Sequence, residues 1–198
     1  MDRSLIWDRW AWDEQYRTGK WDYLADVPEM GRYALIAGYI QRFVSSGRLL
    51  DVGCGEALLY GHLPAADRFD YTGVDFSPVA IAKAAGRFPG LRFAAASAEE
   101  FVDPSGAPFQ GVVFNEVLYM LPDPGNVLRR YRAMLAPRGM VLISTFLPKP
   151  EDAAWCAQIQ RVWEAVGREN WNCLDLSEVW NARVKTSWRV AVLQPDAA

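Results

Sequence analysis

The sequence predicts an α/β fold built on a doubly wound, mostly parallel sheet with helices on both faces. Short apolar runs alternate with segments of helical periodicity, which is the pattern of βαβ units. Two of these runs end in residues that suit a ligand site, because Leu49–Val52 leads into a glycine-rich turn and Phe69–Val74 leads into Asp75. The chain has 198 residues, of which 51% are hydrophobic, so we expect a single domain over residues 1–198.

The glycine-rich turn is the stretch around which the other elements are placed. Leu49–Val52 is apolar apart from one acid, as expected of a parallel strand buried between two layers of helices. Gly53, Cys54 and Gly55 break this strand, and a helical segment starts at Ala57. Glycines at this position let the backbone turn sharply and approach a ligand closely, because no Cβ is in the way.

Asp75 ends the second strand, and its carboxylate is well placed to accept hydrogen bonds from a ribose. The two strand ends therefore predict a nucleoside-binding site. A pyrophosphate-binding turn would carry a third glycine where Leu58 stands, and Asp51 and Glu56 make this turn acidic. A nucleoside that carries an ammonium and a sulfonium, and no phosphate, fits the turn better.

The stretch Leu49–Ala57 (LLDVGCGEA) resembles motif I of the class I S-adenosylmethionine-dependent methyltransferases, hydrophobic-Asp-x-Gly-Cys-Gly-x-Gly. Asp75 matches the ribose-binding acid of that family. Ala57 replaces the third glycine of the motif, and a slightly shifted loop accommodates its extra methyl. The resemblance implies a Rossmann-like fold with a seven-stranded sheet, a C-terminal hairpin that adds an antiparallel strand, and S-adenosylmethionine as the cofactor.

The resemblance also implies which residues bind this cofactor. Ser97 stands where the family most often has an aspartate, so the adenine contacts are expected to rest more on the backbone of Ala98. Ser97 also suits the N-cap of a short helix around Glu99–Phe101. Asn115 is expected at the methionine end. The full predicted set is Tyr16, Trp21, Asp51, Gly53, Cys54, Gly55, Asp75, Phe76, Ser97, Ala98 and Asn115.

The catalytic candidates are Glu116 and Tyr119, which follow the fourth predicted strand and face the expected acceptor pocket. Glu116 is a candidate base for a hydroxyl acceptor, and Tyr119 either polarises the acceptor or packs. His62 is the only histidine, and its face of the helix, shared with Leu58 and Leu59, favours packing over catalysis. The acceptor pocket itself is expected from residues 1–24, 115–121 and 147–180.

The N-terminal segment, residues 1–30, is rich in aromatics. Four of the nine tryptophans lie within its first 21 residues, and Trp12 and Tyr16 share one face of a helix that Gly19 ends. One interpretation is a helix that docks on the sheet. The other is a lid in which Tyr16 and Trp21 stack over the cofactor or substrate. The pattern loosely resembles lids of the thiopurine, tellurite-resistance and nodulation-type methyltransferases.

The remaining elements follow from periodicity and from helix signals such as Ser77-Pro78. Helices are expected at 31–44, 57–62, 78–88, 124–135 and 153–166. Further strands are expected at 91–94, 109–114, 140–146, 179–184 and 187–193, with a tight turn at 136–139 and irregular structure at 170–179.

Composition narrows the class of partner. A net charge of −3 gives no electrostatic reason to expect nucleic-acid binding, and no apolar run is long enough for a membrane span. The cysteines, Cys54, Cys156 and Cys173, form no Cys-x-x-Cys pair, so neither a disulfide framework nor a metal site is expected. The N-terminus lacks a secretory apolar region, so we expect a cytoplasmic protein. We expect it to be a monomer or a homodimer.

The function expected from these features is methyl transfer from S-adenosylmethionine to an oxygen or nitrogen of a small molecule, such as a sugar or secondary metabolite. Two alternatives stay open. One is a protein of this fold that binds the cofactor without transferring its methyl group. The other is an NAD(P)-linked oxidoreductase, which the missing third glycine and the lack of a Tyr-x-x-x-Lys pair disfavour.

Overall fold

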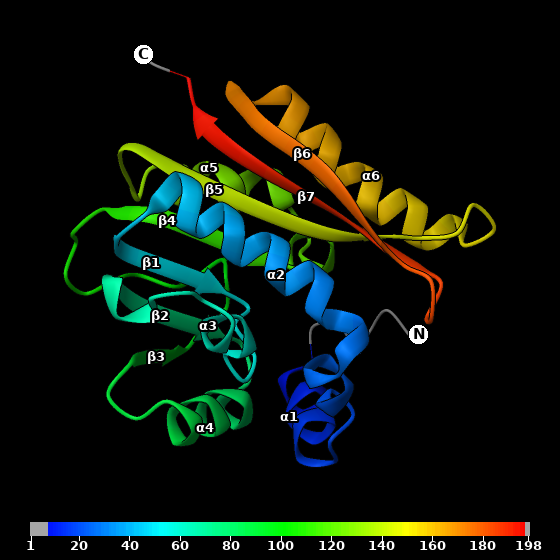
Figure 1. Ribbon diagram of the computed structural model, residues 1–198, viewed down its shortest axis with the longest axis horizontal. Coiled ribbons are helices and arrows are strands. Elements are labelled where there is room, and N and C mark those ends of the chain that lie inside the picture. Colours follow the sequence, from blue (N-terminus) through cyan, green and yellow to red (C-terminus); the bar gives the residue numbers. More distant parts are fainter. Residues whose placement is uncertain (1–7, 197–198) are drawn as a thin grey trace.

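A computed structural model describes residues 8–196 of the chain. Its centre is a seven-stranded sheet in the order β3-β2-β1-β4-β5-β7-β6 (Figure 1). Strands β1 to β5 pair in parallel, and β7 is antiparallel to both of its neighbours. This arrangement confirms the predicted fold class. The strands are β1 (Gly47–Val52), β2 (Phe69–Asp75), β3 (Arg92–Ala95), β4 (Phe109–Asn115), β5 (Leu135–Leu147), β6 (Trp171–Asn181) and β7 (Thr186–Pro195).

Two of the helices that flank the central strands begin at side-chain caps supplied by the sequence. The Ser77 hydroxyl accepts a hydrogen bond from the Ala80 N–H at the start of α4, and the Asp123 carboxylate accepts one from the Asn126 N–H at the start of α5. A π-helical turn, Ile40–Val44, extends α2. The α-helices are α1 (Arg9–Arg17), α2 (Met30–Tyr39), α3 (Leu58–Gly61), α4 (Pro78–Arg87), α5 (Pro124–Arg132) and α6 (Ala153–Arg168).

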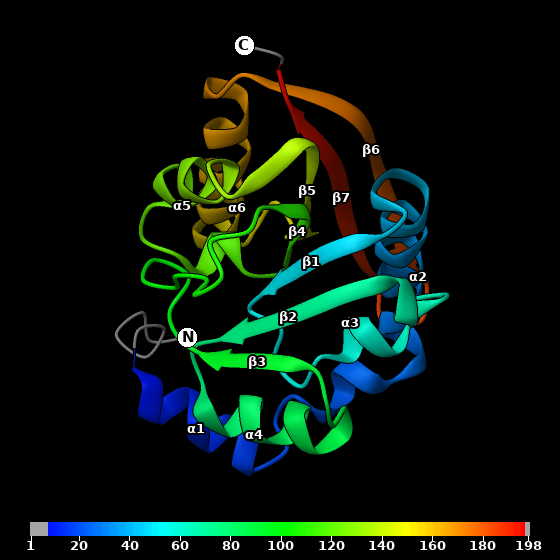
Figure 2. The ribbon, with the colours of Figure 1, turned by 90° about the vertical axis from the view of Figure 1, so that its left-hand side faces the viewer.

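Helices cover both faces of the sheet because its strands alternate side chains between two cores. Leu49 belongs to the core that contains residues of α2, α3 and α4, whereas Leu50 belongs to the core under α5 and α6. Figure 2 shows α2 and α3 on one side of the strands and α5 and α6 on the other. The central strands are therefore apolar on both faces, which explains their continuous hydrophobic runs.

The chain reverses direction across the sheet next to β1. It adds β2 and β3 on one side of β1 and then returns to place β4 on the other side. In doubly wound sheets such a reversal opens a crevice at the carboxyl ends of the strands, where ligands bind. Here those ends carry Gly53, Asp75 and Asn115.

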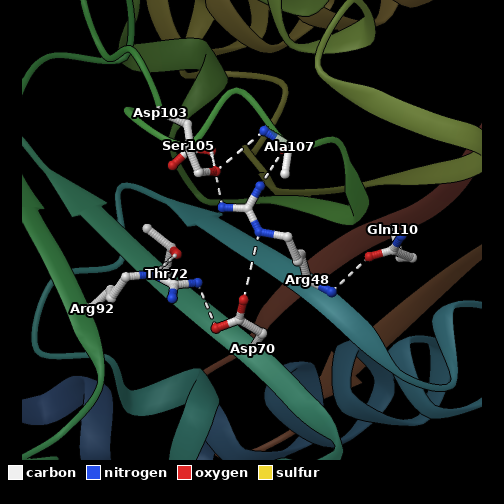
Figure 3. A network of polar contacts seen from close by, with 8 residues as sticks. All are labelled: Arg48, Asp70, Thr72, Arg92, Asp103, Ser105, Ala107 and Gln110. Atoms are coloured by element: carbon white, nitrogen blue, oxygen red, sulfur yellow. Dashed lines mark hydrogen bonds and ion pairs between the residues drawn. The ribbon is translucent and has the colours of Figure 1, made fainter.

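A polar network holds the opposite edge of the sheet together (Figure 3). The guanidinium of Arg48, at the start of β1, pairs with Asp103 at 2.9 Å and with Asp70 at 3.6 Å. It also donates to the carbonyl of Ala107 and lies over the ring of Phe109, 4.2 Å from its centroid. Arg48 thereby fixes the loop between β3 and β4 to the amino ends of the strands, far along the strands from the crevice.

The C-terminal hairpin differs from the prediction. Residues 171–179 belong to β6 instead of an irregular segment. Of the predicted strand 179–184, residues 179–181 end β6 and residues 182–184 lie in the turn between β6 and β7. Two causes hid the strand. It lies at the sheet edge, where polar residues are tolerated, and a register shift between Cys173 and Asp175 breaks the alternation of side chains.

Two helical predictions are also wrong. The helix expected at Glu99–Phe101 is a single turn closed by the Phe101 N–H and the Ser97 carbonyl, and Asp103-Pro104 follows it too soon for a helix. The segment 124–135 leaves the helix after Arg132, since Leu135 already pairs with Phe109. The expected turn 136–139 is an irregularity within β5, whereas the helix expected at 57–62 is α3, with Ala57 and His62 as its caps.

Candidate functional site

A cavity of about 690 Å³ lies at the carboxyl ends of the central strands. Every cofactor-binding and catalytic candidate predicted from the sequence lines this cavity, so the fold brings the whole predicted set together. These residues come from α1 and the segment after it, from the ends of β1, β2 and β4, and from the turn after β3. They are Tyr16, Trp21, Asp51, Gly53, Cys54, Gly55, Asp75, Phe76, Ser97, Ala98, Asn115, Glu116 and Tyr119.

The floor of the cavity is the glycine-rich turn. The N–H groups of Gly53 and Cys54 donate to the Val74 carbonyl at 2.7 and 3.0 Å, so the turn is tied to the end of β2. Gly53 has a φ of +71°, and a Cβ there would lie 2.1 Å from a methyl of Val117. Only glycine satisfies both conditions. Ala57 also has a positive φ, +57°, a left-handed conformation that favours glycine, and its methyl is fully buried.

Asp75 is buried beside this turn. Its carboxylate accepts hydrogen bonds from the Gly55 N–H at 2.9 Å and the Ser77 N–H at 2.8 Å. Burial raises the pKa of Asp75 to about 6, although both backbone hydrogen bonds act in the opposite direction. The carboxylate thus joins the glycine-rich turn to the start of α4 while it lines the cavity.

Asp51 supplies a buried acceptor without a partner. One oxygen, Oδ2, accepts from the Tyr71 hydroxyl at 2.8 Å, but Oδ1 has no hydrogen-bond partner among residues 8–196. Burial raises the pKa of Asp51 to about 7. An unpaired buried carboxylate oxygen is costly unless a ligand pairs with it, so the cavity fits a ligand with a cationic group at this point.

Arg32 is a cavity residue that the sequence reasoning missed. Its side chain is only 2% exposed and donates to the Asn115 Oδ1 at 2.6 Å and to the Glu29 Oε2 at 2.7 Å. A signal was available, because Arg32 lies four residues before Ile36 on the apolar face of α2. A charged side chain on such a face is buried and paired, which marks it as a candidate.

Glu116 and Tyr119 form one hydrogen-bonded unit. Glu116 accepts from the Ser144 hydroxyl at 2.6 Å, from the Phe146 N–H at 2.9 Å and from the Tyr119 hydroxyl at 3.0 Å. Burial, and then the charge of Glu116, raise the pKa of Tyr119 well above its ordinary value. Tyr119 is therefore protonated at neutral pH and acts as a hydrogen-bond donor.

The N-terminal helix docks on α4 and not on the sheet, which corrects one of the two interpretations of this segment. Asp13 accepts a hydrogen bond from the Ser77 hydroxyl, and the Lys83 ammonium donates to the Tyr16 carbonyl at 2.7 Å. Trp21 stacks on Trp12 with ring centroids 5.4 Å apart. Both rings line the cavity, so a lid role for this segment stays a prediction. Residues 1–7 of the predicted lid lie outside the described residues.

Part of the cavity lining is an aromatic cluster from the turn after β4, from β5 and from α6. Tyr119, Phe146 and Trp155 meet edge to face, with centroids 5.3 to 5.9 Å apart. Of the expected stretch 147–180, Trp155 alone lines the cavity in the described structure, because the strand β6 occupies the sheet edge instead. The β6–β7 hairpin contributes Val184, Thr186 and Trp188 in its place.

Other candidate groups stay outside the cavity. His62 stacks on Tyr33 with centroids 5.0 Å apart and is not among the lining residues, which agrees with a packing role. Within residues 8–196, no cluster of histidine, cysteine and acidic side chains is arranged to hold a metal ion. No helix in the same range is long and apolar enough to cross a membrane.

Comparisons with known proteins place the chain in a family. A family profile described as "Methyltransferase domain" matches residues 29–183. The chain is 35% identical to a ubiquinone biosynthesis O-methyltransferase of Caulobacter sp. strain K31 over 50% of the chain and 40% of the relative. It is 27% identical to the 27-O-demethylrifamycin SV methyltransferase of Amycolatopsis mediterranei, over 94% of the chain and 69% of that protein. It spans at most half the length of the first three curated relatives.

The structure is similar to that of the N-methyltransferase NodS from Bradyrhizobium japonicum WM9, which was solved with S-adenosyl-L-homocysteine. The TM-score is 0.69 at 19% identity, over 88% of this chain and 91% of NodS. This likeness shows the same fold. Together with the profile match and the glycine-rich turn, it leads to one assignment: the chain belongs to the class I S-adenosylmethionine-dependent methyltransferases.

Proposed function

We propose that the protein transfers the methyl group of S-adenosylmethionine to an oxygen or nitrogen atom of a small-molecule acceptor. The observation that carries this proposal is the unpaired Oδ1 of Asp51, buried beside the glycine-rich turn in a cavity that Asp75 also lines. A cofactor with one ammonium, one sulfonium and one carboxylate suits a cavity in which acidic side chains predominate.

Each part of the cofactor finds a suitable group in this arrangement. Asp51 would pair with the ammonium, and Asp75 would accept from the ribose hydroxyls. Arg32, buried beside Asn115, places a positive charge for the carboxylate. Phe76, Ser97 and Ala98 line the cavity where the adenine would lie.

When bound, the cofactor would supply a methyl carbon on a positively charged sulfur: the acceptor's lone pair would bond to this carbon while the carbon–sulfur bond breaks in line, and the sulfur would leave as a neutral thioether. The protein's task is alignment and the exclusion of water. The stacked pair of Trp12 and Trp21, held at the cavity by the docked α1, excludes water.

Glu116 and Tyr119 would act at the acceptor. Three donors hold the Glu116 carboxylate in one orientation, and its oxygens are placed to take the proton that a hydroxyl or amine loses on methylation. Tyr119 keeps its own proton and serves to orient Glu116. Relatives named as O- and N-methyltransferases are both similar to this chain, so either acceptor atom is compatible with the fold.

The test uses methyl-labelled S-adenosylmethionine and a pool of small metabolites. We expect label in a low-molecular-mass product. We also expect Asp75→Ala to weaken S-adenosylhomocysteine binding by about 1–2 kcal/mol in calorimetry, the order expected for loss of a charge-assisted hydrogen bond. Unchanged affinity would contradict the ribose role of Asp75.

Two other outcomes separate the alternatives. If S-adenosylhomocysteine binds tightly and no product carries label, the protein binds the cofactor without transferring its methyl group. If neither S-adenosylhomocysteine nor S-adenosylmethionine binds, but NADH raises the melting temperature, the oxidoreductase interpretation replaces both.

A further inference from the structure

The acceptor end of the cavity offers rings and few free polar groups. Tyr119, Phe146 and Trp155 pack against one another edge to face, and Trp188 from the hairpin lines the same cavity. Rings in edge-to-face contact hold one another in place, so these side chains form a fixed apolar wall. A wall of this kind binds a flat ring by contact over its surface.

The polar groups beside this wall already bond to one another. Both oxygens of Glu116 accept hydrogen bonds from the protein, and the Tyr119 hydroxyl donates to Glu116. The two Nη groups of Arg32 donate to Asn115 and Glu29, while its Nε has no partner among the described residues. A polar acceptor such as a sugar would therefore find few free partners here, and its hydroxyls would be desolvated without compensation.

The charge of the cavity excludes anionic acceptors. Among the described lining residues, acids outnumber bases by seven to two. Both arginines are engaged: Arg87 pairs with Glu56 at 3.1 Å, while Arg32 pairs with Glu29 at 2.7 Å and is the residue proposed above for the cofactor's carboxylate. No lining cation is thus left to pair with a carboxylate or phosphate of the methyl acceptor. Such a group would instead lie near the negative charge of Glu116. The seven acids are Asp22, Glu29, Asp51, Glu56, Asp75, Glu99 and Glu116.

We infer that the methyl acceptor is a planar aromatic molecule that carries no carboxylate, phosphate or sulfate group. This inference rests on the proposed function, since it concerns the acceptor of the same reaction. The nucleophilic hydroxyl or amine is a substituent of the ring system and meets Glu116 while the ring lies along the wall of Tyr119, Phe146 and Trp155.

The experiment measures binding of four probes to the protein saturated with S-adenosylhomocysteine. Three share an indole ring and differ in charge: tryptamine, 3-methylindole and indole-3-acetate. The fourth, 2-cyclohexylethylamine, keeps the amine of tryptamine and lacks the aromatic ring. We expect tryptamine and 3-methylindole to bind at least about tenfold more tightly than indole-3-acetate, and tryptamine to bind more tightly than the cyclohexyl amine.

A pair of variants on one helix locates the binding site. Trp155→Leu should weaken binding of 3-methylindole about tenfold and leave the affinity for S-adenosylhomocysteine unchanged. Trp163→Leu is the matched control, because Trp163 lies on the same α6, bonds to Thr145 and does not line the cavity. It should change the affinity for 3-methylindole less than twofold. Melting temperatures identify variants that fail to fold.

Binding of the four probes to the wild-type protein is enough to refute the inference. Indole-3-acetate binding within twofold of 3-methylindole would overturn the exclusion of anions. Equal binding of the cyclohexyl amine and tryptamine, or no binding of any indole at millimolar concentration, would overturn the aromatic class. Failure of S-adenosylhomocysteine itself to bind would instead contradict the proposed function.

Discussion

At the scale of single residues, the site depends on carboxylates that the fold buries. Asp51 and Asp75 stand at the ends of adjacent strands, and burial raises the pKa of Asp51 to about 7 and that of Asp75 to about 6. Asp75 is compensated by two backbone N–H groups, whereas the Oδ1 of Asp51 has none. Without ligand, Asp51 is therefore a source of instability that a bound cation would relieve.

This imbalance gives a pH-dependent stability. An unfolded aspartate has a pKa near 3.9, so between about pH 4 and pH 7 the folded protein binds more protons at Asp51 than the unfolded chain does. The free energy of unfolding consequently falls as the pH rises through this window. Asp51→Asn removes the penalty, and we expect it to raise the melting temperature of the ligand-free protein more at pH 8 than at pH 5.

Thermal unfolding at the two pH values checks this prediction. Asp67→Asn is the control, since Asp67 is exposed. Asp51→Asn should also bind S-adenosylhomocysteine more weakly at pH 8, because the ammonium loses its charged partner. A gain in melting temperature that is equal at both pH values would contradict the account.

At the scale of elements, the N-terminal segment shows how a packed helix can also cover a site. The docking contacts of α1 are directed to α4, while Tyr16 and Trp21 face the cavity. The Tyr16 hydroxyl lies so close to Gly55 that a Cβ there would be 2.9 Å away. Docking on α4 and lining of the cavity therefore use different side chains of one N-terminal segment.

We expect Trp21→Ala to reduce turnover more than stability, because the lost ring covers the cavity and shields it from water. Trp10→Ala is the matched control, since Trp10 belongs to α1 and is 68% exposed. Rates with saturating S-adenosylmethionine and melting temperatures of both variants are the measurements. Normal turnover together with a lowered melting temperature for Trp21→Ala would assign the ring to packing alone.

At the scale of the whole molecule, the two edges of the sheet have separate tasks. The carboxyl ends of the strands carry the cavity, and the amino ends carry the Arg48 network (Figure 3). The network joins β1 and β2 to the loop before β4 without touching a cavity residue. Stability and binding should accordingly respond to different substitutions.

Arg48→Met tests this separation. It retains an apolar side chain over Phe109 but leaves Asp103, whose side chain is 7% exposed, without its guanidinium partner. We expect a loss of about 1–3 kcal/mol in the free energy of unfolding, measured with urea, and unchanged affinity for S-adenosylhomocysteine. A comparable loss in both quantities would show that the two edges are coupled.

Much of the fold was predictable because its signals are local. Apolar runs followed by turn residues predict the strands β1 to β5 and the ends of these strands that face the cavity. The same two signals recur at each of these strands. The edge strand β6 was missed because only pairing with β7 makes it a strand. No pattern within residues 170–181 substitutes for that partner.

The sequence by itself determined the class of fold, the glycine-rich turn and the position of Asp75, since each depends on neighbouring residues and their backbone preferences. Only the tertiary structure decided that Arg32 joins the cavity lining, that α1 docks on α4, and that Trp155 and Trp188 line the same cavity. These contacts join residues far apart in the chain, and their free energy comes from burial and pairing that exist only once the sheet is assembled.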